Sequence, residues 1–251
     1  MSFKNKLNTI LRKYNVEVHG LGYLQALAKG EFKNNEIDVI KKIYGDDNII
    51  IYDIGANKGV TLETFLQTFP NSSIHAFEPY LPLYQMLKKQ FSSNENVFIN
   101  QKAISNIVGE SVFNVNKSVD TNSLLSSKRT GLNSDSKVQT IQQVKVDVTT
   151  IDEYAIRHKH ERIHVCKIDI QGNELKALKG AAVLLGERRI DVVFTETYFL
   201  QQYEDQSLFF EIAEYLLPFG YVLQDIYHPI YGKGRLAWCD AMFIKEDLKC
   251  I

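Results

Sequence analysis

A short segment with two glycines and an aspartate has the spacing of a ligand-binding turn. It reads Asp53-Ile-Gly-Ala-Asn-Lys-Gly59 and lies between a β-branched run and a helical pattern. Gly55 and Gly59 let the backbone turn tightly and approach a ligand closely. A phosphate-binding turn has small residues where this chain has Asn57 and Lys58, which disfavours NAD or FAD. The segment therefore favours a ligand without phosphate groups.

Glu78 supplies a second carboxylate, at the end of the next predicted strand. It lies 25 residues after Asp53, close to the roughly 20 residues that separate the corresponding groups in dinucleotide-binding units. A carboxylate there can accept hydrogen bonds from both hydroxyls of a ribose. The alternative is that the glycines only make a turn and Glu78 is a solvated loop residue. Two such signals on consecutive strand ends favour a nucleoside-type cofactor.

S-adenosylmethionine (SAM) fits these groups, because it joins a nucleoside to a methionine ammonium, a carboxylate and a sulfonium. Asp53 suits the cationic part, directly or through water, and backbone N–H groups near the helix N-terminus suit the carboxylate. Two small apolar residues follow the third predicted strand, where the adenine would lie. The predicted cofactor site is Asp53, Gly55, Ala56, Asn57, Gly59, Glu78, Ala103 and Ile104.

Three further residues are candidates for proton transfer. Asp169 ends the fourth predicted strand and Glu196 ends the fifth, so both are expected at the sheet edge where α/β folds bind ligands. His228, predicted in the loop between the last two strands, has a side chain that titrates near neutral pH. The alternatives are a turn-capping role for Asp169 and a plain surface position for His228. A divalent metal is disfavoured, because it needs more oxygen ligands than Asp169 and Glu196 supply.

Strand-like and helix-like segments alternate along most of the chain, which predicts βαβ units and a parallel sheet. The last two strands follow each other without a helix, so we expect an antiparallel hairpin at one edge. The fold class is α/β, a Rossmann-like, mainly parallel sheet of seven strands with an antiparallel last strand and helices on both faces. The predicted strands are 49–52, 74–77, 96–99, 164–168, 191–194, 221–226 and 238–244.

Three regions need separate predictions. Residues 1–47 carry helical apolar stripes and are expected to form a cover on a main domain of residues 48–251. Residues 116–140, rich in Ser, Thr and Asn, predict a long loop between short strands at 111–115 and 144–148. One helix is predicted after the fourth main strand, with Asn173 as its cap and Glu174 in its first turn.

The composition excludes several function classes. The chain has 251 residues, which suits one large domain, and a formal net charge of −1, which does not indicate a nucleic-acid binder. No stretch approaches the ~18 apolar residues of a membrane span, and no secretory signal is visible. The three cysteines, Cys166, Cys239 and Cys250, lack metal-binding spacing. They predict free thiols in a reducing, cytoplasmic compartment.

Together these motifs resemble the FkbM-type methyltransferase family over about residues 49–245. The resemblance rests on the turn at 53–59, on Phe77-Glu-Pro79, and most specifically on Lys167-Ile-Asp-Ile-Gln-Gly-Asn-Glu174 with Leu178-Lys-Gly180 behind it. It implies a class I methyltransferase sheet, SAM at Asp53, Gly55, Asn57, Gly59 and Glu78, and an O-methyltransferase activity. Many members carry Glu where this chain has Gln171, so an acid role does not carry over there.

We therefore predict SAM-dependent methylation of a hydroxyl on a carbohydrate, glycan or natural-product acceptor, with S-adenosylhomocysteine (SAH) as product. Two alternatives remain at this point. One is N-methylation of a small amine, and the other is a SAM-binding subunit without catalytic activity. The acceptor itself is not encoded in any readable motif, and its selection is expected to lie in the 116–140 loop, the N-terminal cover and the last loop.

Overall fold

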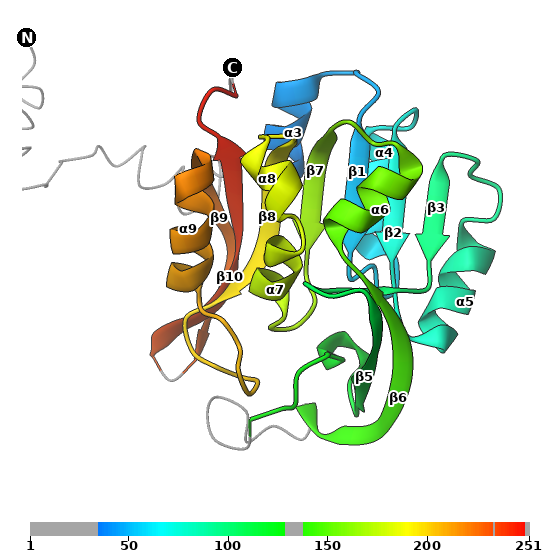
Figure 1. The fold of residues 1–251 in the computed structure, drawn as a ribbon, viewed down its shortest axis with the longest axis vertical. Helices are drawn as coiled ribbons and strands as arrows, with labels where there is room; N and C mark the ends of the chain where they lie inside the picture. The colour runs from blue at the N-terminus through cyan, green and yellow to red at the C-terminus, as the bar shows by residue number, and fades with distance from the viewer. Residues whose placement is uncertain (1–34, 129–137, 233, 249–251) are drawn as a thin grey trace, which may run out of the picture. The chain divides into compact units, whose positions relative to one another are not determined.

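The computed structural model describes residues 35–128, 138–232 and 234–248. Its main sheet has the seven predicted strands: β1 (Ile50–Ile54), β2 (Ser73–Phe77), β3 (Val97–Asn100), β7 (Ile163–Ile168), β8 (Ile190–Tyr198), β9 (Tyr221–Gly232) and β10 (Arg235–Lys245). Their order is β3-β2-β1-β7-β8-β10-β9 (Figure 1). The pairs from β3 to β8 are parallel, and β10 is antiparallel to both neighbours. The predicted fold class, including the antiparallel last strand, is confirmed.

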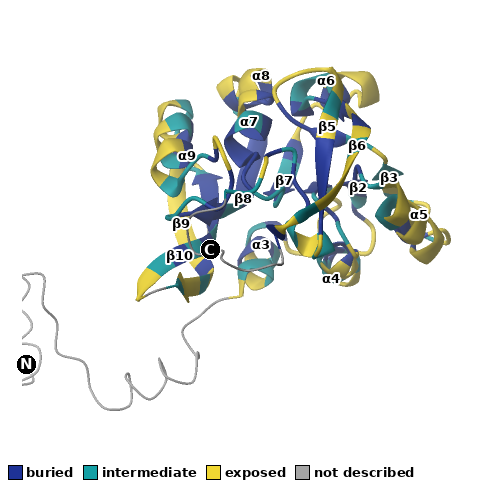
Figure 2. Ribbon diagram, turned by 90° about the horizontal axis from the view of Figure 1, so that it is seen from below, coloured by how far each residue is buried: buried dark blue, intermediate teal, exposed yellow. Residues whose placement is uncertain are grey.

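Helices cover both faces of this sheet (Figure 2). On one face lie α4 (Val60–Thr68) and α5 (Leu81–Gln90), and on the other lie α6 (Ile151–His158), α7 (Glu174–Lys179), α8 (Ala182–Gly186) and α9 (Phe209–Leu216), followed by the short helix η4 (Leu217–Phe219). This double cover explains the continuous apolar runs of the central strands, because their side chains are buried on both faces. In β1, only Ile50 is not fully buried.

The helix predicted after the fourth main strand is in fact two helices, so that prediction is wrong. The break falls at Gly180, where an added Cβ would lie 2.2 Å from the carbonyl oxygen of Ser105. The Gly180 carbonyl accepts a hydrogen bond from the N–H of Asp152. The Asp152 carboxylate in turn accepts from the N–H groups of Val183 and Leu184 and so caps α8. These distant partners hold the chain in two short helices, although the apolar periodicity is continuous.

A second, three-stranded sheet lies beyond the carboxyl ends of the main strands (Figure 1). It consists of β4 (Ala103–Ile104), β5 (Gly109–Asn116) and β6 (Thr140–Thr149), in the order β4-β6-β5. The strands predicted at 111–115 and 144–148 are present and longer, whereas β4 was not predicted. The sheet has a small core of its own: Ala103, Phe113, Val115, Val146 and Val148. The connection between β5 and β6 includes the short helix η2 (Val119–Thr121), which contacts the turn after β1 through Asp120.

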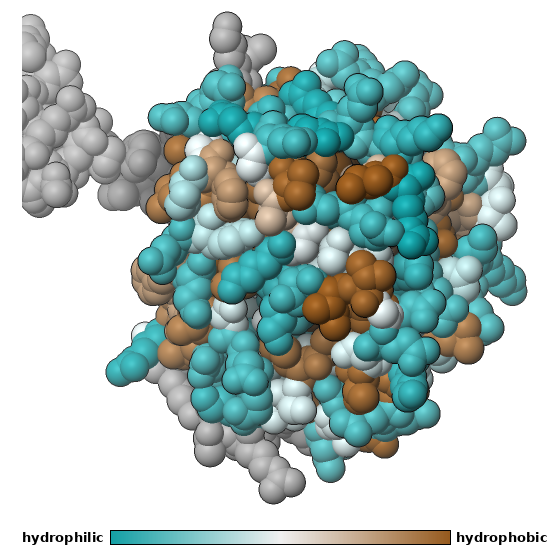
Figure 3. All heavy atoms as spheres, in the orientation of Figure 1, coloured by the Kyte–Doolittle hydropathy of each residue, from teal (hydrophilic) through white to brown (hydrophobic). Residues whose placement is uncertain are grey.

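Several predictions concern parts of the chain away from this edge. The helix α3 (Glu36–Tyr44) lies within the predicted N-terminal cover, and the rest of that cover up to residue 34 is outside the described residues. Cys166 and Cys239 are buried and free, as predicted, and Cys250 is not described. No helix among the described residues is long and apolar enough to cross a membrane. On the face shown in Figure 3, hydrophobic side chains form small groups among hydrophilic ones.

Candidate active site

A cavity of about 290 Å³ lies at the carboxyl ends of β1, β2, β7 and β8. Its volume is near the lower end of the range of roughly 300–1,000 Å³ found for small-molecule sites. Its position matches the edge at which open α/β sheets bind ligands. Of the predicted site residues, Gly55, Asn57, Glu78, Ala103, Ile104, Asp169 and Glu196 line it, whereas Asp53, Ala56, Gly59 and His228 are not among the lining residues.

The turn after β1 is held tightly by the neighbouring strands. Gly55 has a left-handed φ of 85°, and a Cβ there would lie 1.9 Å from the carbonyl oxygen of Asp169. The N–H groups of Gly55 and Ala56 both donate to the carbonyl of Phe77 at 3.0 Å, and that of Gly59 donates to Ala56. These N–H groups are therefore already used within the protein. The prediction that backbone N–H groups near the helix N-terminus hold a ligand carboxylate therefore does not extend to these three groups.

The Glu78 carboxylate is buried beside this turn. One oxygen accepts the N–H of Asn57 at 3.0 Å, and the other accepts the N–H of Tyr80 at 2.9 Å. These bonds fix the orientation of the carboxylate, and each oxygen keeps capacity to accept a further hydrogen bond. Burial raises the pKa of Glu78 to about 7, although both N–H bonds oppose the shift.

Asp53 faces the interior of the sheet, where it pairs with Lys167 on the neighbouring strand. The Lys167 Nζ lies 3.2 Å from Asp53 Oδ1, and it donates to the Gly55 carbonyl at 3.2 Å. Burial alone would lower the pKa of Lys167, but the carboxylates of Asp53 and Asp169 raise it above its ordinary value. Asp53 is fully buried. It is not among the lining residues of the cavity, and sequence reasoning missed Lys167 as its partner.

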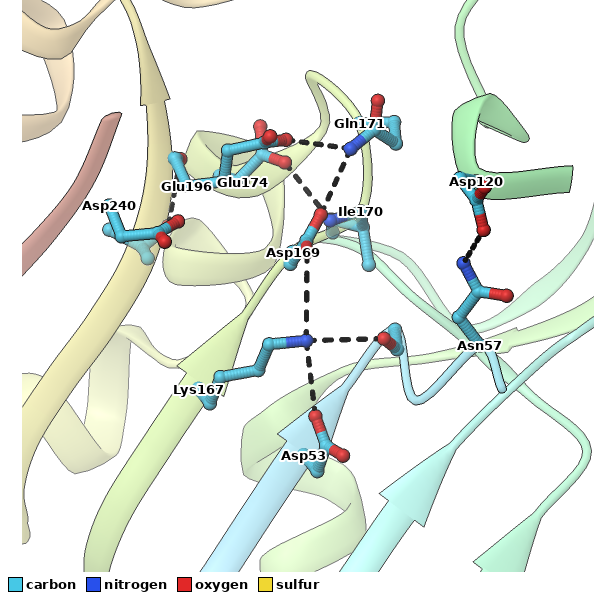
Figure 4. Close-up of polar contacts among 12 residues, drawn as sticks. Asp53, Asn57, Asp120, Lys167, Asp169, Ile170, Gln171, Glu174, Glu196 and Asp240 are labelled. Carbon is cyan, nitrogen blue, oxygen red and sulfur yellow. Dashed lines mark hydrogen bonds and ion pairs between the residues drawn. The ribbon is translucent and has the colours of Figure 1, made fainter. Parts of the chain in front are cut away.

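Asp169 and Glu196 meet across the cavity wall through a single amide (Figure 4). The Gln171 Nε2 donates to Asp169 Oδ1 at 3.0 Å and to Glu196 Oε2 at 2.7 Å. The Gln171 Oε1 accepts from the hydroxyls of Tyr198 and Tyr203. All hydrogen-bonding groups of this amide are thus occupied, so its orientation is fixed. The structure brings together the two acids that the sequence placed on separate strand ends.

The two acids have different electrostatic surroundings. Burial raises the pKa of Glu196 well above its ordinary value, and the neighbouring carboxylates of Asp169 and Glu174 raise it further. The Tyr198 hydroxyl donates to Glu196 at 2.5 Å. The Asp169 side chain is 38% exposed and lies 3.8 Å from the Lys167 ammonium. These surroundings favour the protonated form of Glu196, whereas the Asp169 carboxyl is partly exposed and lies beside a cation.

The turn between β7 and α7 is stabilised by Glu174. Its buried carboxylate accepts the N–H groups of Ile170 and Gly172, both at 3.0 Å. Burial raises the pKa of Glu174 to about 7. Asn173 stands at the cap position, but its side chain makes no capping bond and instead donates to the Ile104 carbonyl. The predicted cap role of Asn173 is therefore wrong, because the amide ties this turn to β4.

His228 lies outside the cavity. The prediction placed it in a loop, but β9 continues to Gly232 and includes it. Its Nδ1 lies 2.9 Å from Asp240 Oδ2, and its side chain is 62% exposed. Asp240 is paired in register with Glu196 across β10 and β8. Asp169 and Glu196 therefore line the cavity, whereas His228 does not. One strand, β10, lies between β9, which carries His228, and β8, which carries Glu196.

The segment after β5 forms a wall of the cavity that was predicted only as a loop. Val119, Asp120, Asn122 and Leu124 line it. Asp120 Oδ1 accepts the Lys58 Nζ at 2.8 Å and the Asn57 Nδ2 at 3.2 Å (Figure 4). The polar composition of 116–140 was the only signal for these residues, and it did not single any of them out. Residues 129–137 of that loop are outside the description.

The family model for the methyltransferase FkbM domain matches residues 53–223. The chain belongs to this family. Membership confirms the family resemblance, and with it SAM as the cofactor that the resemblance implied. No curated protein matches the sequence.

Three solved structures of methyltransferases are similar to this chain at low sequence identity. An rRNA methylase from Streptococcus thermophilus is 12% identical with a TM-score of 0.49, and the match covers 85% of this chain and 98% of that one. Fibrillarin from Aeropyrum pernix, with natively bound SAM, is 13% identical with a TM-score of 0.44, covering 88% and 74%. M. capricolum TrmK in complex with SAH is 10% identical with a TM-score of 0.45, covering 86% and 70%. These likenesses do not indicate the acceptor.

Proposed function

We propose that this protein is a SAM-dependent O-methyltransferase that acts on a hydroxyl of a carbohydrate, glycan or natural product. The observation that carries the proposal is the position of Asp169. Asp169 lines the cavity and its side chain is partly exposed, and its backbone carbonyl lies against Gly55 in the glycine turn of the family motif. A methyl transfer to a hydroxyl needs a base at such a position, because an alcohol is a poor nucleophile until its proton begins to leave.

The residues around the cavity fit the cofactor. Glu78 is buried and oriented by two backbone N–H groups, so it is suited to accept the hydroxyls of a ribose. Leu83, Ala103 and Ile104 give the same end of the cavity an apolar wall suited to an adenine. Asp53 is too deep to touch a ligand and contributes through its pair with Lys167. The bound cofactor supplies an electrophilic methyl group on a sulfonium.

Asp169 is the proposed proton acceptor, and Gln171 and Lys167 are its positioning residues. The Gln171 amide holds one oxygen of Asp169, and the Lys167 ammonium lies 3.8 Å from the other. One oxygen therefore stays oriented, while the exposed part of the side chain remains available to an acceptor. Glu196, which burial and its neighbours favour in the protonated form, is suited to hold a second oxygen of the acceptor as a hydrogen-bond donor.

The acceptor class follows from the polarity of this wall. The cavity lining includes four acids, Glu78, Asp120, Asp169 and Glu196, and one lysine, Lys102. Because Glu196 is favoured in the protonated form and Asp120 is paired with Lys58, this lining offers mainly hydrogen-bonding groups, and its described residues include no cluster of cations to bind a phosphate or carboxylate of an acceptor. A neutral, hydroxyl-rich molecule such as a sugar is the best match. The buried free thiols Cys166 and Cys239 support a reducing, cytoplasmic compartment for the proposed enzyme.

Two measurements test the proposal in sequence. Calorimetric titration with SAH checks the cofactor site, and we expect saturable binding at one site per chain. Incubation with methyl-labelled SAM and a panel of neutral, aminated and phosphorylated sugars then checks the reaction. Transfer of label to an oxygen of the neutral sugars is the expected result. Binding of SAH without transfer to any hydroxyl, or transfer only to the nitrogen of amino sugars, would overturn O-methylation.

A further inference from the structure

One buried side chain in the cavity wall has an unused hydrogen-bond donor. Asn122 follows η2, lines the cavity and is 8% exposed. Its Oδ1 accepts the N–H of Asn116 at 2.8 Å, which fixes which way the amide points. Its Nδ2 has no partner among the described residues. A buried amide donor without a partner is unfavourable, because its desolvation is not compensated, so this position favours a ligand atom that accepts a hydrogen bond.

The segment around Asn122 spans the two sides of the cavity. On one side of it, Asp120 contacts Asn57 and Lys58 in the turn after β1. On the other side, the Ser123 hydroxyl donates to the Gln171 carbonyl at 2.7 Å. The segment that holds Asn122 therefore joins the glycine turn to the turn after β7, and the region of the cavity wall that it forms lies between these two turns. Leu83, Ala103 and Ile104, the apolar residues suited to the adenine, are separate lining residues.

That region is where the amino-acid part of the cofactor would lie if the proposed function is correct, and its carboxylate needs donors. The backbone donors of Gly55, Ala56 and Gly59 are already used, and the N–H of Asn57 donates to Glu78. The Gln171 amide is also fully occupied. In contrast to these donors, the Asn122 Nδ2 is a buried side-chain donor without a partner among the described residues.

We infer that Asn122 binds the carboxylate of the cofactor's methionine part through its Nδ2. This inference rests on the proposed SAM site and names a cofactor-binding residue outside the family's glycine turn. A carboxylate suits the site better than a neutral oxygen, because a hydrogen bond to a charged group is stronger and compensates the desolvation of the amide. The ammonium of the same ligand cannot take this role, since it only donates.

Two variants and two ligands test the inference. Asn122→Asp keeps an oxygen that can accept the N–H of Asn116 and replaces the Nδ2 donor by a carboxylate oxygen. Asn122→Leu has a similar size and removes both the acceptor and the donor. SAH carries the carboxylate, and 5′-methylthioadenosine has the same nucleoside and sulfur but no amino-acid part. In calorimetry we expect both variants to lose about 10- to 100-fold in SAH affinity, the size of a lost charge-assisted hydrogen bond. Their affinity for methylthioadenosine should stay within about twofold.

Thermal melting of each variant serves as the folding control, and the parent protein serves as the control for the site itself. Equal losses for both ligands would overturn the inference, because they would place Asn122 at the nucleoside or make it only a support of the wall. Unchanged SAH affinity in both variants would overturn it as well. If the parent bound neither ligand, the proposed function itself would fail, which is a separate result.

Discussion

The buried Glu78 carboxylate makes cofactor affinity depend on pH in a direction that the structure fixes. Burial raises its pKa to about 7, so near neutral pH a large fraction of the protein without ligand carries a protonated Glu78. Ribose hydroxyls donate hydrogen bonds and therefore bind the ionised form better. Binding should lower this pKa toward the ordinary value of 4.5. Affinity for SAH should accordingly rise with pH.

The size of the effect follows from the two pKa values. With a free-state value of about 7 and a bound state that stays ionised, the apparent affinity at pH 6 should be about tenfold weaker than at pH 8. Glu78→Gln has nearly the same shape but no charge to titrate. We expect this variant to bind SAH about 10- to 100-fold more weakly than the parent at pH 8, from the loss of charge-assisted hydrogen bonds. The gap between the two proteins should narrow at pH 6.

Calorimetric titration of SAH into both proteins at half-unit steps between pH 6 and 8 is the assay. Glu78→Gln also controls for titration of the ligand's own amino group, because that contribution is the same in both proteins. Thermal melts at each pH check that both stay folded. An affinity independent of pH in the parent, or one that changes equally in both proteins, would refute the assignment of Glu78 to the ribose.

Other variants test the neighbouring parts of the site. Asp169→Asn keeps shape and removes charge, so turnover should fall by roughly 10²–10⁴ with little change in SAH affinity, and near-normal turnover would exclude Asp169 as the base. Gly55→Ala places a Cβ 1.9 Å from the Asp169 carbonyl at a left-handed φ, and denaturant titration should show a loss of about 2–4 kcal/mol. An unchanged denaturation midpoint would contradict the close contact between Gly55 and the Asp169 carbonyl. The pKa of Glu174 is about 7 through burial, so between pH 4.5 and 7 the native state holds a proton that the unfolded chain has lost. The free energy of unfolding should therefore fall as pH rises through this window, and Glu174→Gln should reduce the fall by up to about 3 kcal/mol. Denaturant titrations of both proteins at several pH values check this, and the same pH dependence in parent and variant would contradict it.

The main sheet could be predicted because its signals are local. Each strand of the parallel part is an apolar run, and each except β3 is followed by a helix with its own apolar stripe. The second sheet could not be predicted in the same way. Its strand β4 has only two residues and pairs with β6 more than forty positions away, so no local pattern indicates it. The split between α7 and α8 was missed for the same reason, since it depends on the Ser105 carbonyl next to Gly180.

The sequence predicted where the site residues lie along the sheet edge, but not which side chains they contact. The strand ends placed Glu78, Asp169 and Glu196 at one edge, and all three line the cavity. The partners of a side chain at a strand end depend on which strand lies beside it, and the sequence does not give the strand order. Asp53 is the example, because its register partner is Lys167 on β7. An acid expected to face a ligand is therefore buried in an ion pair.

That ion pair links the two halves of the proposed chemistry. Asp53 comes from the strand of the glycine turn and Asp169 from the strand of the acceptor side, and one ammonium lies 3.2 Å from the first and 3.8 Å from the second. Removing one partner of a buried ion pair strongly destabilises the folded protein, because the other charge is left buried and uncompensated. Lys167 has two such partners, so Asp169→Asn leaves its ammonium paired with Asp53 at 3.2 Å. The glycine turn and the proposed proton acceptor therefore share one buried cation, and Asp53 still compensates it when the charge at Asp169 is removed, which is why SAH affinity is expected to change little.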